Sequence, residues 1–257
     1  MAATTNTNAN HNPAAQGTTL MVYMVGSDLE SNPDLRAGTR NLNEMLKAAA
    51  AANVNVVIET GGANVADATT IVKTWRSVKR HALKNGQLQA LADIGAQNMG
   101  ASQTLTDFIT WAAKSYPAAN YRLVLWDHGA GWKGFGLDEN QTTQNSMTVP
   151  QMTAGVDGGA RAAGIRFDVI GFDACLMATA EVEAALAPDA DYLLASEELE
   201  PGSGWDGRSR SKTRVRAPRS SVVRLSTALL PSSSRARMAP WIAALARCLR
   251  PPTPLHR

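Results

Sequence analysis

Short apolar runs alternate along the chain with longer segments in which apolar side chains recur every three or four positions. Buried strands of a parallel sheet read as continuous apolar runs, whereas helices that cover a sheet have one apolar face. Five runs are typical of strands, at residues 18–25, 55–60, 121–126, 167–173 and 192–196. Their alternation with helical segments predicts an α/β fold with a mostly parallel central sheet that is covered on both faces.

Helical segments separate these runs. The apolar spacing predicts helices at about residues 34–52, 102–116, 150–164 and 176–187. Ser102 is expected to cap the second of these helices, as a serine at the N-cap often does.

A β-hairpin is expected beside the main sheet, because two weakly alternating segments at residues 71–81 and 87–91 flank Asn85-Gly86. His81 lies in the hairpin next to two basic residues, and we interpret it as a surface residue.

Two acids, Asp28 and Glu30, follow the first strand and precede the first helix. We interpret them as acids at the N-terminus of that helix, where the positive end of the helix dipole stabilises a negative charge.

A lone cysteine ends the run at residues 167–173. Cys175 follows Asp173 and Ala174, and open α/β sheets bind their ligands at the carboxyl ends of their strands. Because a helix is expected to begin directly after Cys175, its dipole would favour the thiolate. The alternative is that Cys175 is simply a small buried apolar residue.

A histidine occupies the corresponding place after the run at residues 121–126. His128 is followed by Gly129 and Gly131, which allow the backbone to turn tightly. If the two strands are neighbours in a parallel sheet, His128 and Cys175 meet at the same edge. A thiol and an imidazole at one edge are the minimum for cysteine-nucleophile catalysis.

The chain has 257 residues, which suffices for one substantial α/β domain. Two cysteines give no disulfide framework, and no apolar run approaches the 18 residues or so of a membrane span. Residues 1–18 contain neither a basic region nor an apolar core, so we interpret them as a flexible N-terminal segment rather than a signal peptide. A G-x-S-x-G elbow, a phosphate loop and a Cys/His metal cluster are missing, which disfavours other hydrolase classes.

Charge divides the chain sharply. Residues 1–206 contain 13 Lys and Arg against 22 Asp and Glu, whereas residues 207–257 contain 12 Lys and Arg and no acid. Residues 207–257 have three interpretations: a disordered basic tail, an out-of-frame translation of a GC-rich gene, and an arm that binds nucleic acid. The abrupt change of composition favours the out-of-frame interpretation, and the single aromatic residue, Trp241, disfavours nucleic-acid binding.

Residues 126–132 (WDHGAGW) and 172–177 (FDACLM) resemble the histidine and cysteine signatures of the clostripain family of cysteine peptidases. The resemblance extends over residues 19–206, with further matches at residues 23–24, 98–108 and 195–202. It implies a caspase-like three-layer sandwich related to gingipains and legumains, with residues 19–206 as an incomplete catalytic domain that is truncated at its C-terminus.

The resemblance also implies an endopeptidase that cleaves after Arg or Lys. Cys175 would be the nucleophile and His128 the general acid/base, with no need for a third catalytic residue. The N–H groups of Gly129 and Cys175 would form the oxyanion hole. Asp173 would bind the cationic side chain of the substrate, with Glu198 and Asp206 as weaker candidates at the pocket rim.

Further implications concern cofactors, partners and location. Some family members use calcium, but the sequence has no dense Asp/Asn ligand loop, so we expect no cofactor. The expected partner is a peptide or protein substrate, with neither nucleic acid nor membrane. Members are frequently exported, and many mature by cleavage after a basic residue in the loop beyond the histidine. Residues 134–160 contain no Lys or Arg. The alternative function is an inactive, truncated caspase-fold module for binding or regulation.

Overall fold

The computed structural model describes residues 17–48, 54–200, 204 and 220–224. These residues form an eight-stranded sheet with the strand order β4-β3-β2-β1-β5-β6-β7-β8. The strands are listed in chain order: β1 (Thr18–Val25), β2 (Val54–Gly61), β3 (Val78–Lys84), β4 (Gln87–Gly95), β5 (Asn120–Trp126), β6 (Phe167–Asp173), β7 (Ala190–Ser196) and β8 (Ser220–Arg224).

The five strands expected from the apolar runs are the parallel part of the sheet. β2, β1, β5, β6 and β7 pair in parallel, whereas β3, β4 and β8 pair with their neighbours in antiparallel. The prediction of an α/β fold with a mostly parallel sheet is therefore confirmed.

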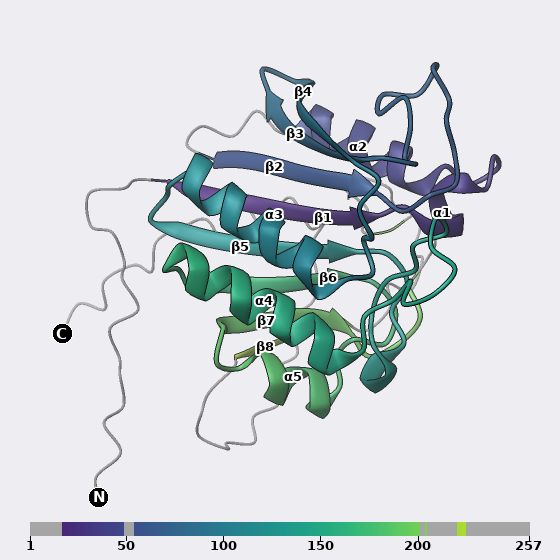
Figure 1. Cartoon of the computed structure of the whole chain (residues 1–257). Coiled ribbons are helices and arrows are strands. Elements are labelled where there is room, and N and C mark those ends of the chain that lie inside the picture. Colours follow the sequence, from purple (N-terminus) through teal and green to yellow (C-terminus); the bar gives the residue numbers. More distant parts are fainter. Residues whose placement is uncertain (1–16, 49–53, 201–203, 205–219, 225–257) are drawn as a thin grey trace, which may run out of the picture.

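Helices lie on both faces of the sheet, as Figure 1 shows. α3 (Ser102–Ser115), α4 (Val149–Ala163) and α5 (Ala180–Leu186) cover one face, and α2 (Ala37–Ala48) covers the other. Successive side chains of β1 point to opposite faces of the sheet. Tyr23 packs into the core under α3 and α4, whereas Val22 packs into the core under α2. The result is the three-layer sandwich that the sequence predicts.

The predicted helix at residues 34–52 corresponds to α2, which is preceded by a short α1 (Ser27–Ser31). α3 and α4 agree with their predicted spans to within one residue. Ser102 does not cap α3, however, because Ala101 is the N-cap and the Ser102 hydroxyl donates to the Gln151 carbonyl instead. That bond ties α3 to α4, so tertiary packing takes the hydroxyl that a local cap would have used.

The predicted hairpin is present, but its first strand, β3, begins seven residues later than expected and pairs with β2. Asn85 and Gly86 both have positive φ, at 54° and 71°, as a type I′ turn requires. The hairpin therefore extends the main sheet.

The prediction that His81 lies at the surface is wrong. His81 is 3% exposed and its Nε2 lies 3.0 Å from the Thr60 hydroxyl. Burial lowers its pKa to about 4. Lys79 lies two positions away on the same side of the strand, whereas Arg80 points to the opposite side and pairs with Glu59, so the basic neighbours were no guide to the exposure of His81.

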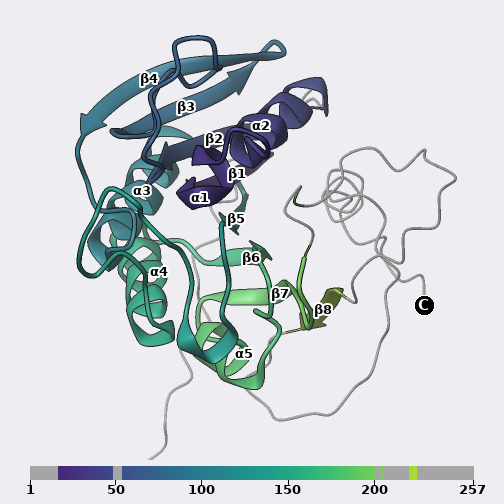
Figure 2. The ribbon, with the colours of Figure 1, turned by 90° about the vertical axis from the view of Figure 1, so that its right-hand side faces the viewer.

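The strand order reverses between β1 and β5. In the sheet, β2 lies next to β1 on one side of this point, and β6 lies next to β5 on the other side. Ligands of open α/β sheets bind outside the carboxyl ends of the strands at such a switch point. Figure 2 looks at this edge of the sheet directly.

Most of residues 207–257 lies outside the described residues, and so do residues 1–16. The three interpretations of residues 207–257 and the division of the chain at residues 18 and 206 therefore stay predictions. Within the described part of the chain, no helix is long and apolar enough to cross a membrane.

Candidate functional site

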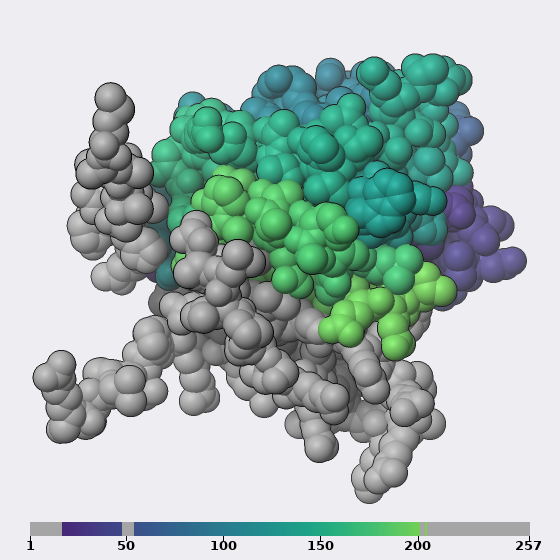
Figure 3. Space-filling model, turned by 90° about the horizontal axis from the view of Figure 1, so that it is seen from below, coloured from purple at the N-terminus to yellow at the C-terminus, as the bar shows by residue number. Residues whose placement is uncertain are grey.

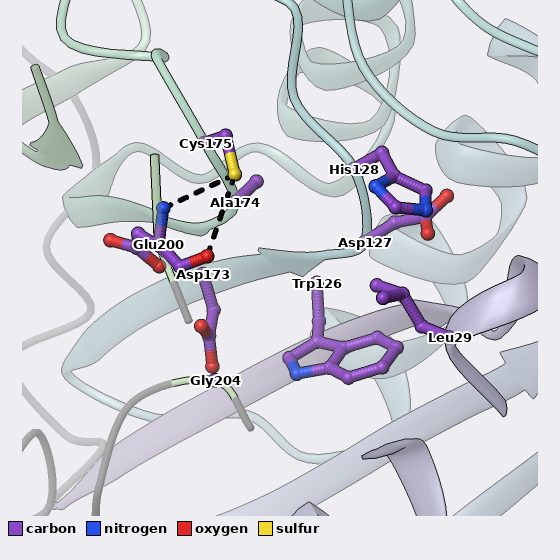
Figure 4. A pocket seen from close by; sticks show the side chains of 9 residues that line it. All are labelled: Leu29, Trp126, Asp127, His128, Asp173, Ala174, Cys175, Glu200 and Gly204. Atoms are coloured by element: carbon purple, nitrogen blue, oxygen red, sulfur yellow. Dashed lines mark hydrogen bonds between the residues drawn. The ribbon is translucent and has the colours of Figure 1, made fainter. Parts of the chain in front are cut away.

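A pocket of about 140 Å³ opens at the carboxyl ends of β5 and β6. The side chains around it come from four segments of the chain, and Figure 4 shows them: Leu29, Trp126, Asp127, His128, Asp173, Ala174, Cys175, Glu200 and Gly204. The strands that carry His128 and Cys175 are neighbours, with Trp126 opposite Asp173 in the parallel register. The two residues therefore reach the same edge of the sheet, as the sequence predicts.

The loop after β7 completes one wall of this pocket. Seen from below, the light green segment that ends at residue 200 borders the purple N-terminal segment (Figure 3), and Glu200 and Leu29 line the same pocket.

Cys175 is half-buried and its thiol contacts the loop after β7. The Glu200 N–H donates to the Cys175 Sγ over 3.2 Å. The N–H of Leu176, the residue after Cys175, donates to the Glu198 carbonyl of the same loop. The thiol also lies 3.8 Å from the Glu200 carbonyl oxygen, so both main-chain polar groups of Glu200 contact Sγ.

The helix expected directly after Cys175 begins later than predicted. Leu176 has a φ of 62°, and α5 starts at Ala180 with Thr179 as its N-cap. The expected support of the thiolate by a helix dipole is therefore wrong, because the dipole acts only within the first turn.

His128 is bound by a carboxylate. Its Nε2 lies 2.7 Å from Oδ1 of Asp28, and the two side chains are 44% and 61% exposed. Within the described part of the chain, no hydrogen bond joins the side chains of His128 and Cys175. Figure 4 shows them on opposite sides of the pocket.

Asp127, the residue before His128, is a buried acid. It accepts a 2.5 Å hydrogen bond from the Ser27 hydroxyl and a second from the Leu137 N–H. Burial raises its pKa to about 7, despite these two hydrogen bonds, which act in the opposite direction. Asp127 therefore joins the ends of β1 and β5 to the loop beyond the histidine.

Gly129 lies against the backbone of Cys175. A Cβ atom at this position would be 2.2 Å from the Cys175 carbonyl oxygen, so only glycine fits. Two bonds flank Gly129, from the Gly136 N–H to the His128 carbonyl and from the Ala130 N–H to the Gly134 carbonyl. The assignment of the Gly129 and Cys175 N–H groups to an oxyanion hole stays a prediction.

Asp173, the last residue of β6, is 6% exposed and lines the pocket with Trp126 and Gly204. A Cβ on Gly204 would lie 3.1 Å from the Asp173 carboxylate. Of the two weaker candidates for the rim, the structure describes only Glu198. Glu198 has an exposed side chain and contacts the site through its carbonyl, and Asp206 lies outside the described residues.

Three residues of this site were not predicted from the sequence: Asp28, Asp127 and Glu200. Asp28 was interpreted as a helix acid, and its contact with His128 spans 100 residues of sequence. Asp127 stands directly before His128, which is the one local signal that was available. Glu200 contacts Cys175 through its backbone N–H, and no pattern of residue types predicts such a contact.

No group of three or more His, Cys, Asp or Glu side chains in the described ranges could hold a metal ion. The expectation that the protein needs no cofactor stays a prediction.

Solved structures with the same fold are cysteine proteases. One is a secreted C11 cysteine protease from Bacteroides thetaiotaomicron, solved with an irreversible peptide inhibitor; it is 25% identical, with a TM-score of 0.59 over 74% of this chain and 51% of that chain. Another is an inactive zymogen of a C11 protease from Parabacteroides distasonis, at 25% identity, with a TM-score of 0.55 over 75% of this chain and 52% of that one. The chain thus spans about half the length of these relatives.

No curated protein sequence matches the chain. The sequence profile of the clostripain family, however, matches residues 22–230, which extends beyond the expected boundary at residue 206. The match contains both strand ends and the loop after β7, and the solved relatives share the caspase-like fold. The chain belongs to the clostripain family.

Proposed function

We propose that this chain carries the catalytic site of a cysteine endopeptidase that hydrolyses peptide bonds after Arg or Lys. The observation that carries the proposal is the convergence of Cys175, His128 and Asp173 on one pocket at the switch point of the sheet. Family membership supports the reaction class, because the related structures are described as cysteine proteases.

The Cys175 thiol gives its proton to His128, and the resulting thiolate attacks the carbonyl carbon of the scissile bond and forms a tetrahedral oxyanion. The N–H groups of Gly129 and Cys175 stabilise this oxygen, a contribution of about 3 kcal/mol for a single donor in other acyl-transfer enzymes. As the C–N bond breaks, His128 gives a proton to the leaving amine. His128 then takes a proton from water, the water attacks the thioester, and the carboxylic acid leaves as the thiol is regenerated.

Catalysis from two sides of the substrate suits the geometry of the pocket. Cys175 and His128 lie on opposite sides of it, so each can contact its own atom of the scissile bond without a direct bond between them.

Asp173 sets the preference for a cationic side chain. Its carboxylate is nearly buried at the end of β6 and lines the pocket, so it would attract a guanidinium or ammonium group that enters there. The pocket is small, so one extended side chain fills it.

The test is hydrolysis of fluorogenic peptides with Arg, Lys, Asp or Leu before the scissile bond. The wild-type chain is expected to cleave after Arg and Lys, and Cys175→Ala to abolish the turnover. Asp173→Asn is expected to lower kcat/KM for Arg and Lys peptides at least 10-fold, because it removes the charge that selects them. Glu198→Gln, the same change at an exposed acid nearby, is the matched control and should leave kcat/KM within about 2-fold.

Turnover that prefers Asp or Leu, or that survives Cys175→Ala, would overturn the proposal. A folded chain that binds Arg peptides through Asp173 without cleaving them would identify it as the inactive binding module instead.

A further inference from the structure

Two hydrogen bonds join the ends of β1 and β5 like the rungs of a ladder. The inner rung is buried and connects Ser27 to Asp127 at 2.5 Å, and the outer rung connects Asp28 to His128 at 2.7 Å. Both rungs follow from the parallel pairing of β1 with β5, which places Met24 opposite Trp126 and brings the residues after each strand together.

The outer rung fixes where the histidine carries its proton. A carboxylate only accepts hydrogen bonds, so the contact requires the proton on Nε2 of His128. In the neutral ring Nδ1 then holds the lone pair. Nδ1 is therefore the nitrogen that exchanges protons with the substrate, and the imidazole is prepared for this before the substrate arrives.

We propose that Asp28 is a positioning residue for His128: it holds the ring in the Nε2–H tautomer and presents Nδ1 to the scissile bond. This inference rests on the proposed function. Asp28 itself does not line the pocket, and its carboxylate contacts His128, which does. It acts through the imidazole, as the third group of a nucleophile–base–orienter arrangement does.

The inner rung supports the outer one. Asp127 accepts from the Ser27 hydroxyl and from the Leu137 N–H, so the backbone that leads into His128 is held from two sides. Ser27 has a φ of 45°, an uncommon value for a residue other than glycine. This turn ends β1 abruptly and directs Asp28, the next residue, toward His128.

The exposure of the outer rung separates a positioning role from a structural one. Ion pairs this open to water contribute little to stability, since solvent and salt screen them. Removal of the Asp28 carboxylate should therefore leave folding unchanged while it alters the state of the imidazole. A residue that mattered only for the fold would show the reverse.

The experiment compares Asp28→Asn and Asp28→Leu with wild type. Asp34→Asn is the matched control, because Asp34 is an exposed acid of the same segment whose hydrogen bonds run through its main chain. Three measurements are made on each protein: kcat and KM on an Arg peptide, the thermal unfolding temperature, and the ¹⁵N shifts of the His128 ring, assigned by their absence in His128→Gln.

Asp28→Leu is expected to lower kcat about 10-fold to 100-fold with KM within about 2-fold, since the loss falls on proton transfer rather than on binding. Asp28→Asn retains an acceptor oxygen and should lose less. The neutral ring of wild type should be protonated at Nε2, and Asp28→Leu should shift it toward a mixture of both tautomers. The thermal unfolding temperature should be the same in all four proteins.

An unchanged kcat and tautomer in Asp28→Leu would overturn the proposal, and so would losses in Asp34→Asn of the same size. If wild type cleaves no peptide, the proposed function fails. The ring measurement still decides whether Asp28 sets the tautomer, because it needs no turnover.

Discussion

Two histidines of this protein show how surroundings decide what an imidazole can do. His128 follows a parallel strand at the switch point, is 44% exposed, and is hydrogen bonded to the Asp28 carboxylate. His81 lies within the antiparallel strand β3, is 3% exposed, and contacts the hydroxyl of Thr60. Burial lowers the pKa of His81 to about 4, so this ring stays neutral near pH 7.

The difference follows from position in the sheet. A residue inside a strand has neighbours on both sides and its side chain points into a layer, whereas a residue just past the strand end is free to face a ligand. In the described part of the chain, the charged groups within reach of His81 include Lys79, which further disfavours its protonation. His128 has a carboxylate partner and access to water, which proton exchange requires.

The strongest contrast is expected in activity. His128→Ala should lower kcat/KM on an Arg peptide by at least 1000-fold, because it removes the group that protonates the leaving amine. His81→Gln should leave kcat/KM within about 3-fold, since the ring lies away from the pocket and its loss acts on stability. Equal losses in the two variants, with both proteins folded, would contradict the comparison.

A second contrast concerns Asp127, the buried acid beside His128. Its pKa is raised to about 7, so the native state holds a proton that the unfolded chain loses near pH 4. The contribution of Asp127 to the free energy of unfolding is therefore complete below about pH 4. It is lost as the pH rises through 7, by roughly 4 kcal/mol in total. Relative to wild type, Asp127→Asn should gain stability over this range in urea unfolding.

Glu59, whose pKa burial also raises to about 7, is present in both chains and cancels in this difference. A stability difference between Asp127→Asn and wild type that is constant from pH 4 to pH 8 would show that Asp127 is ionised in the native state throughout.

His81 should show the opposite sign and a somewhat smaller effect. Its pKa is lowered to about 4, so the unfolded chain binds a proton that the native state refuses between pH 6.5 and pH 4. The contribution of His81 to the free energy of unfolding is complete above about pH 6.5. It is lost as the pH falls through 4, by roughly 3 kcal/mol. The advantage of wild type over His81→Gln should shrink accordingly as the pH falls. An advantage that grows instead would show that the native state protonates His81.

The sequence alone predicted the sheet and the two strand ends well, because apolar runs and their order carry that information. The parallel strands, the hairpin at Asn85-Gly86 and the convergence of His128 with Cys175 were all legible in the residues. The catalytic assignments themselves stay proposals until activity is measured.

What the sequence did not predict depends on contacts between distant segments or on the backbone. Asp28 meets His128 across 100 residues, and its sequence neighbours gave it a plausible role in a helix. Leu176 has a positive φ and α5 begins only at Ala180, and the residue types around Cys175 did not predict this turn. His81 was misplaced because its basic neighbours in the sequence were taken as a sign of exposure, whereas its ring is buried beside Thr60.

The most direct test of the central claim is covalent labelling with a peptide acyloxymethyl ketone that carries Arg at the reactive end. The Cys175 thiolate would displace the carboxylate leaving group and form a thioether, which mass spectrometry locates. The account predicts one adduct, at Cys175, in the native wild-type chain, at least 10-fold slower labelling in Asp173→Asn, and none in Cys175→Ala. No adduct on the native chain, or equal labelling by a probe that carries Asp instead of Arg, would contradict it.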